Sequence, residues 1–195
     1  GPQATTLPVG IPDPAADPVG VAGLIGVQAL TAPLPDAGPA ETAVLRRLSG
    51  QTATRAADLY ERVPGLGAFL TSEQALLVHN GGAAATTPLV ASYPTGPVPT
   101  LDFPYVVLPG ATQPEVAAAT EFLNHLLAPD ARRVLQAAGF RDPDGSAPGR
   151  PAPTPSQSGD QVQGDRVAPV RMPSEDDLVQ VLSRWTGVQL SARIL

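Results

Sequence analysis

The chain of 195 residues has no cysteine and no lysine. Without cysteine it can form neither a structural disulfide nor a zinc site that uses thiolates. The two histidines, His79 and His125, belong to no metal-binding motif, so we expect no metal ion and no cofactor. All twelve basic residues are arginine, a usage that is typical of high-GC genomes such as those of actinobacteria.

Aromatic residues and long apolar runs are also scarce. Aromatic side chains make up 4% of the residues and hydrophobic residues 43%, so alanine and valine must supply much of the core. No run of about 18 apolar residues is present, and we therefore expect no membrane-spanning helix. The net charge of −6 argues against binding to nucleic acids or to anionic lipid surfaces.

The short motifs of common enzymes are absent as well. The sequence contains no Gly-x-Ser-x-Gly elbow, phosphate loop, His-Glu-x-x-His or dinucleotide fingerprint. We therefore expect a protein that is not an enzyme, and we name no catalytic residue. Folding could still bring together two of the eighteen carboxylates, which leaves a hydrolase as the least favoured alternative.

Proline and glycine, by contrast, are abundant, with 24 and 19 residues. Between residues 142 and 173 the composition changes to proline, glycine, serine, glutamine and aspartate, which predicts either a linker or a strap laid over a neighbour. We therefore expect five regions: a tag remnant or tail (1–4), an α/β region (5–103), a strand with two helices (104–141), the linker or strap (142–173) and a C-terminal connector helix (174–195).

The α/β region begins with an alternating run and an apolar helix. Residues 6–11 predict a strand, which Pro8 moves toward the edge of a sheet. Asp17 as N-cap predicts a helix that starts at Pro18, runs to about residue 30 and is buried, because it is apolar on every side. Its glycines at every third position predict close packing against a neighbour (Gly20, Gly23, Gly26). Later residues predict helices over 40–50 and 52–63, a helical start at 71–74 and a strand over 75–79.

Residues 103–141 carry the clearest local signals. The aromatic and β-branched run at 103–108 has the composition and length of a strand. Thr112 and Glu115 form a capping box that predicts a helix, and a second helix opens at Pro129 and ends at Gly139. The apolar residues of the first helix fall on one face (Val116, Ala119, Leu123, Leu126, Leu127), and we expect those of the second helix to point inward (Val134, Leu135, Ala138). Arg141 is expected to pair with an acid or a carbonyl rather than with a ligand.

The last predicted helix begins at Ser174, a suitable N-cap that precedes three acidic residues in the first turn. Its apolar stripe comprises Leu178, Val181, Leu182 and Trp185. This stripe must pack either on the domain itself or on another protein. We name Leu178, Leu182 and Trp185 as the candidate partner-contact residues.

Several stretches resemble the type II extracytoplasmic solute-binding proteins, in particular the molybdate-type binders. Residues 9–20 resemble the strand-to-helix step that opens their second lobe, and TSEQALLV at 71–78 resembles the step before the chain returns to the first lobe. The runs FPYVVL and FLNHLLAPDARRVLQAAGFR, which end at residues 108 and 141, resemble their closing segment. The tail at 174–195 resembles the segment that leads into a von Willebrand factor A domain in actinobacterial surface proteins.

The resemblance implies an α/β fold, a single lobe of the type II periplasmic-binding-protein-like fold with a small sheet flanked by helices. The starting strands of the first lobe and the Asp-x-Ser-x-Ser motif of a von Willebrand factor A domain are not in the chain. In such binders, backbone amides at helix N-termini hold oxyanions, which implies four candidate ligand-binding residues (Val19, Gly20, Thr71, Ser72). Asp17 is expected to serve only as a cap.

Two functions follow from the resemblance. The favoured one is a non-catalytic extracytoplasmic module that acts as a scaffold or interaction domain of a bacterial surface protein, next to a von Willebrand factor A-like domain and anchored to the membrane elsewhere. The alternative is a genuine receptor for a small solute such as an oxyanion. We favour the scaffold because the inferred cleft lacks an obvious charged anchor for a ligand. A scaffold is also expected to bind a protein partner or to form a homo-oligomer.

Overall fold

The computed structural model describes residues 7–82, 88–93, 99–101, 103–146 and 173–194. The first elements are β1 (Val9–Pro12), α1 (Pro18–Thr31) and α2 (Ala37–Ser49). They are followed by β2 (Thr52–Ala53), α3 (Ala56–Tyr60), the 3-10 helix η1 (Val63–Gly65) and β3 (Ala68–Phe69). The remaining helices are α4 (Glu73–Gly81), α5 (Gln113–Leu127), α6 (Pro129–Ala137) and α7 (Glu175–Ile194). The tail at 1–4 and most of the predicted linker at 142–173 lie outside the described residues.

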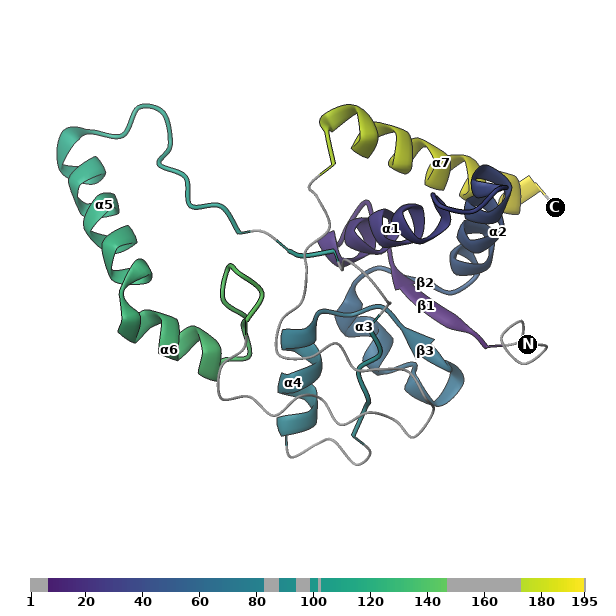
Figure 1. Cartoon of the computed structure of the whole chain (residues 1–195), viewed down its shortest axis with the longest axis horizontal. Helices are drawn as coiled ribbons and strands as arrows, with labels where there is room; N and C mark the ends of the chain where they lie inside the picture. The colour runs from purple at the N-terminus through teal and green to yellow at the C-terminus, as the bar shows by residue number, and fades with distance from the viewer. Residues whose placement is uncertain (1–6, 83–87, 94–98, 102, 147–172, 195) are drawn as a thin grey trace. The chain divides into compact units, whose positions relative to one another are not determined.

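The three strands form a parallel sheet in the order β2-β1-β3 (Figure 1). β1 therefore lies in the middle of the sheet, and the prediction that Pro8 moves this strand to an edge is wrong. Pro8 precedes β1, and its carbonyl accepts hydrogen bonds from the amides of Gly67 (2.9 Å) and Ala68 (3.3 Å). Proline lacks only the N–H, so it can still take part in the sheet as an acceptor. The predicted α/β class, a small sheet flanked by helices, is confirmed.

The helix α1 begins as the sequence predicts. The side chain of Asp17 accepts a hydrogen bond from the amide of Val19 at 2.8 Å, which is the geometry of an N-cap. Close packing explains the first of its glycines, because a Cβ on Gly20 would lie only 2.4 Å from the carbonyl oxygen of Pro12. The end of β1 can approach this helix only because residue 20 has no side chain.

The chain divides into two compact units. Unit 1 comprises residues 1–72, 97–101 and 169–195, and unit 2 comprises residues 73–96 and 102–168. Unit 1 holds the whole sheet together with α1, α2, α3 and α7, whereas unit 2 holds α4, α5 and α6.

The core of unit 1 lies between β1, α1, α2 and α7 (Figure 1). All four elements contribute buried side chains (Ile11, Leu24, Leu45, Leu48, Val181, Trp185, Val188). The amide of Asp177 donates to the hydroxyl of Ser174 at 3.2 Å, so α7 has the predicted N-cap. Of the two arrangements that its apolar stripe allowed, α7 has the one in which it packs on its own domain, against α1 and α2.

Two predicted elements between residues 52 and 79 differ in the structure. Residues 75–79, predicted as a strand, belong to α4. A short apolar run does not distinguish a strand from a helix, and Glu73 favours the helix by placing an acid in its first turn. The helix predicted over 52–63 is divided into β2, α3 and η1, because Thr52 and Ala53 pair with β1 instead.

The run at 103–108, predicted as a strand, pairs with no strand among the described residues. Its Tyr105 side chain contacts α5 instead. The hydroxyl of Tyr105 donates to the carbonyl of Ala119 at 3.0 Å, and its ring centre lies 6.1 Å from that of Phe122. Extended residues need a neighbouring strand for their backbone hydrogen bonds, so composition alone does not make a strand.

The helices α5 and α6 have the predicted ends. α5 begins at a capping box made by Thr112 and Glu115, and α6 is followed by Gly139 with φ of +100°. Neither helix contains a buried residue, however, and Leu127 and Val134 are 71% and 68% exposed. The prediction that the apolar residues of α6 point inward is therefore wrong, and the apolar face of α5 is not covered by a core either.

Candidate functional site

The carboxyl ends of the three strands meet at one edge of the sheet. In open parallel sheets, ligands bind outside this edge at the point where the strand order reverses. The chain passes from β1 to β2 and later returns to β3 on the other side of β1, so the reversal falls between β1 and β3. The loops that follow these two strands, residues 13–17 and 70–72, therefore frame the candidate functional site in unit 1.

Asp17 occupies the first of these loops and engages the backbone on two sides. One carboxylate oxygen accepts from the amide of Val19 and the other from the amide of Ala56, each at 2.8 Å. The amide of Gly20 donates to the carbonyl of Asp17 at 3.0 Å. The backbone amides of the predicted ligand donors, Val19 and Gly20, therefore already donate hydrogen bonds to Asp17.

The second loop carries the other two candidates, Thr71 and Ser72. The hydroxyl of Thr71 lies 2.9 Å from that of Tyr60, in hydrogen-bond contact. The Tyr60 ring also meets Phe69 edge to face, with 4.9 Å between the ring centres. Burial raises the pKa of Tyr60, and the hydrogen bond to Thr71 partly offsets this rise. Both Thr71 and Ser72 are half-buried, and their role in ligand binding stays a prediction.

The candidate partner-contact residues lie on α7. Trp185 is only 3% exposed and belongs to the core of unit 1, whereas Leu182 packs partly buried against that core and Leu178 is half-buried. The indole N–H of Trp185 is buried and has no hydrogen-bond partner in the described structure. A second protein could reach Trp185 only by displacing α7, and contact of these three residues with a partner stays a prediction.

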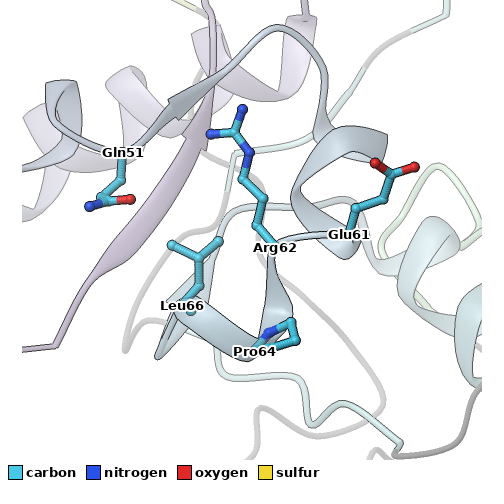
Figure 2. Close-up of a pocket in the computed structure, with 6 residues that line it drawn as sticks. Gln51, Glu61, Arg62, Pro64 and Leu66 are labelled. Atoms are coloured by element: carbon cyan, nitrogen blue, oxygen red, sulfur yellow. The ribbon is translucent and has the colours of Figure 1, made fainter.

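A hollow of about 360 Å³ lies at the opposite, amino edge of the sheet (Figure 2). It is lined by residues that precede β2 or β3 or belong to the turn between them (Gln51, Glu61, Arg62, Pro64, Gly65, Leu66). The guanidinium of Arg62 donates to the carbonyl of Thr52 at 3.1 Å, and the carboxylate of Glu61 points in another direction. The hollow is wide open and its charges do not converge, so we place the candidate site at the carboxyl edge.

Unit 2 contains a cluster of charges that the sequence predicted only in part. The guanidinium of Arg141 donates to both carboxylate oxygens of Glu73, at 2.6 and 2.9 Å, and to the carbonyl of Gly145 at 3.0 Å. The two charged side chains are only 15% and 17% exposed. The expectation that Arg141 pairs with an acid or a carbonyl is therefore confirmed, with both kinds of partner. Its acid lies 68 positions earlier in the chain, and no local pattern pointed to it.

Tyr93 completes this cluster. Its hydroxyl is buried, and burial together with the negative charge of Glu73 raises the pKa of Tyr93 to about 12. The pKa of Arg141 is also raised, chiefly by its hydrogen bonds to Glu73. The arrangement holds Tyr93 neutral and Arg141 charged, so neither group is poised for proton transfer near neutral pH.

Within the described parts of the chain, no three histidine, aspartate or glutamate side chains gather as metal ligands would. None of the described helices combines the length and apolar character that a membrane span requires.

Comparison with known proteins gives one finding. A family model described as bacterial extracellular solute-binding protein matches residues 3–141, well over half of the chain. No curated protein and no solved structure gives a significant match. The matched residues run from before β1 to the end of α6 and do not include α7.

Proposed function

The chain belongs to the bacterial extracellular solute-binding proteins, and we propose that it serves as a non-catalytic scaffold or interaction module within that family. Members of the family are generally not enzymes. The family also implies a small-solute ligand and a location outside the cytoplasm.

The observation that carries the proposal is the position of Asp17. An exposed helix N-terminus attracts anions, because its free amides and the helix dipole both favour negative charge. Here the carboxylate of Asp17 accepts from the amides of Val19 and Ala56, at the starts of α1 and α3. A solute anion would have to displace this carboxylate or sit beside its negative charge. If a lobe of this kind holds an anionic solute at the start of α1, the carboxylate of Asp17 already occupies that position.

Other groups at the same edge are also engaged within the chain. The hydroxyl of Thr71 contacts that of Tyr60. A scaffold needs a stable surface rather than free donors, and these internal contacts are consistent with one. We further propose that the module belongs to a membrane-anchored surface protein with a von Willebrand factor A-like domain, which only the resemblance of residues 174–195 supports.

The alternative function is a genuine solute receptor, which the small-solute ligand implied by the family supports. In that case Val19, Gly20, Thr71 and Ser72 would contact the solute. A receptor gains stability from its ligand by RT ln(1 + [L]/Kd), which is about 2.7 kcal/mol at a hundredfold excess over Kd.

Thermal unfolding in the presence of solutes tests the two functions. Sulfate, phosphate, molybdate and a set of neutral and cationic small solutes are added to the wild-type chain, and the midpoint is followed with concentration. A scaffold shows no saturable rise in midpoint with any of them. A saturable rise with one solute, reproduced by calorimetric titration, would establish the receptor and overturn the proposal.

Two variants of neighbouring aspartates sharpen this test. Asp17→Asn keeps one acceptor oxygen and removes the charge, so an anion that the wild-type chain rejects should gain measurable affinity. Asp13→Asn is the matched control, because the Asp13 carboxylate only accepts from the exposed amide of Ala15. Equal anion binding by both variants would show that the carboxylate of Asp17 does not prevent an anion from binding.

A further inference from the structure

Asn80, the last residue but one of α4, holds a later piece of backbone in unit 2. Its side-chain NH2 donates to the carbonyl of Leu89 at 2.8 Å, and its side-chain oxygen accepts from the amide of Leu89 at 2.9 Å. The side chain thus pairs with both backbone groups of one residue, as the opposite residue of a hydrogen-bonded strand pair would. Asn80 and Leu89 are both half-buried, and we call these two bonds the Asn80–Leu89 clamp.

The residue after Asn80 makes this side chain chemically reactive. The side-chain carbon of an asparagine can be attacked by the backbone nitrogen of the next residue, and glycine hinders this attack least because it has no side chain and the freest backbone. Gly81 is that residue, and it is exposed. α4 ends at Gly81, and the amide of Gly82 closes the last turn on the carbonyl of His79 at 3.1 Å. Because helix ends fray, the backbone at this position can leave the helical geometry and allow the attack.

We propose that Asn80 is a site of spontaneous deamidation, and that the reaction releases Leu89 from the end of α4. The nitrogen of Gly81 loses its proton and bonds to Cγ of Asn80, while the bond from Cγ to Nδ2 breaks and this nitrogen leaves as ammonia. Water then opens the succinimide ring at either of its carbonyl groups, which gives aspartate or isoaspartate. Water is the co-reactant, and no group is oxidised or reduced. The proposal goes beyond the scaffold function and does not depend on it.

The product of the reaction cannot rebuild the clamp. A carboxylate accepts hydrogen bonds but donates none, so the carbonyl of Leu89 loses its donor and faces a negatively charged oxygen instead. In the intact chain, the two bonds of the clamp hold the side-chain amide on Leu89. We therefore expect the reaction to proceed through local opening of the clamp, which makes it slower in the folded chain than in the unfolded chain.

The other asparagine of the chain is an internal reference. Asn124 lies within α5, is exposed and is followed by His125. The wild-type chain is kept at mildly alkaline pH, and its chymotryptic peptides are followed with time by mass spectrometry. We expect Asn80 to be converted at least tenfold faster than Asn124, to both aspartate and isoaspartate, although Asn80 is the less exposed of the two. Conversion of Asn80 at the rate of Asn124 or below it would overturn the proposal.

Gly81→Ala is the matched variant. A Cβ at position 81 would meet nothing within 4 Å, so this change leaves both bonds of the clamp in place. We expect deamidation at least fivefold slower than in the wild-type chain, because the added methyl group hinders the attacking nitrogen. An unchanged rate would show that this nitrogen does not attack Asn80. The chain unfolded in urea gives the intrinsic rate, and a folded chain that keeps Asn80 intact while the unfolded chain is converted would also overturn the proposal.

Asn80→Asp reproduces one product without the reaction and tests the release of Leu89. We expect hydrogen–deuterium exchange at the amides of Leu89 and Val90 to be at least threefold faster in Asn80→Asp than in the wild-type chain. Gly81→Ala should keep the wild-type exchange rate, since its clamp is intact. Equal exchange in Asn80→Asp and in the wild-type chain would show that deamidation does not release Leu89, and would overturn this part of the proposal.

Discussion

At the scale of single residues, Asp17 connects two parts of unit 1 that are far apart in the sequence. Its carboxylate caps α1 through Val19 and holds the amide of Ala56 at the start of α3. An N-cap contributes about 1 kcal/mol, and a buried amide left without a partner costs about 1–3 kcal/mol. We expect Asp17→Ala to lower the free energy of unfolding by about 2–3 kcal/mol, as measured by urea denaturation.

Trp185 provides the signal for this measurement, since it is the only tryptophan of the chain and lies in the core of unit 1. Asp13→Ala serves as the control, with an expected loss below about 0.5 kcal/mol because its hydrogen bond to Ala15 is exposed. Equal losses for both variants would mean that the contact with Ala56 contributes nothing to stability.

The cluster around Tyr93 makes a second prediction, which concerns alkaline pH. The pKa of Tyr93 is raised to about 12 in the folded chain, whereas an unfolded tyrosine titrates near 10. Between these values the unfolded state loses its proton and the folded state keeps it. The stability that Tyr93 contributes is therefore complete below about pH 10 and is lost as the pH rises toward about 12.

The Tyr93→Phe variant removes this titrating group while it keeps the ring. Stability of unit 2, followed by helix content in urea at a series of alkaline pH values, should fall less steeply for Tyr93→Phe than for the wild-type chain. The wild-type chain should also show one tyrosinate that forms at higher pH than any in the variant. Superimposable profiles would show that Tyr93 titrates normally and is not shielded by burial and Glu73.

What the sequence predicts at this scale depends on the distance between partners along the chain. The Asp17 cap, the capping box at Thr112 and Glu115, and the helix end at Gly139 involve residues a few positions apart, and all are confirmed. The pairing of Glu73 with Arg141 was predicted only as a type of contact. Such a pair is set by the tertiary fold, which local propensity does not encode.

At the scale of elements, the same distinction separates the correct from the wrong predictions. α1 and α7 have the predicted N-caps and contribute side chains to the core of unit 1, so these local signals agree with the fold. The prediction that α1 is buried on every side is wrong, because only three of its residues are buried and Leu30 is 51% exposed. Residues 103–108 have the composition of a strand, but among the described residues no neighbouring strand completes their hydrogen bonding. The prediction that β1 lies toward an edge of the sheet is wrong for a related reason. The effect of a proline depends on which side its missing N–H would face.

The third prediction concerns the close packing of Gly20 on α1. Alanine at position 20 would place its Cβ 2.4 Å from the backbone oxygen of Pro12, which cannot move without shifting β1. We expect Gly20→Ala to lower the thermal midpoint by several degrees, since an overpacked core site typically costs about 1–3 kcal/mol.

Gly187 on α7 is the matched position for comparison. It is exposed within the helix, and an added Cβ there would meet nothing within 4 Å. The Gly187→Ala change should therefore stabilise the chain by about 0.5–1 kcal/mol through helix propensity alone. Shifts of the same sign in both variants, measured by circular dichroism, would contradict the close approach of β1 to α1.

At the scale of the whole chain, the resemblance to solute-binding proteins predicts a lobe, and the family match supports the family assignment. The sequence does not predict that α7 completes the core, because an apolar stripe does not specify the surface that it covers. Nothing in the sequence indicated that α4 groups with α5 and α6 rather than with the sheet. That division depends on contacts between distant segments, for which neither composition nor periodicity provides a signal.

The different burial of the helices makes the fourth prediction, which concerns local stability. Amides exchange slowly where opening exposes a packed core and quickly where helices carry few buried contacts. α1, α2 and α7 all contribute to the core of unit 1, whereas α5 and α6 contain no buried residue. We expect hydrogen–deuterium exchange, resolved by mass spectrometry, to be at least tenfold faster in α5 and α6 than in α1 and α2. The unfolded chain under the same conditions gives the intrinsic rates for comparison.

Equal protection of the amides in α5 and α6 and of those in α1 and α2 would contradict this prediction. It would mean that the exposed apolar side chains of α5 and α6, Leu127 and Val134 among them, are covered in solution.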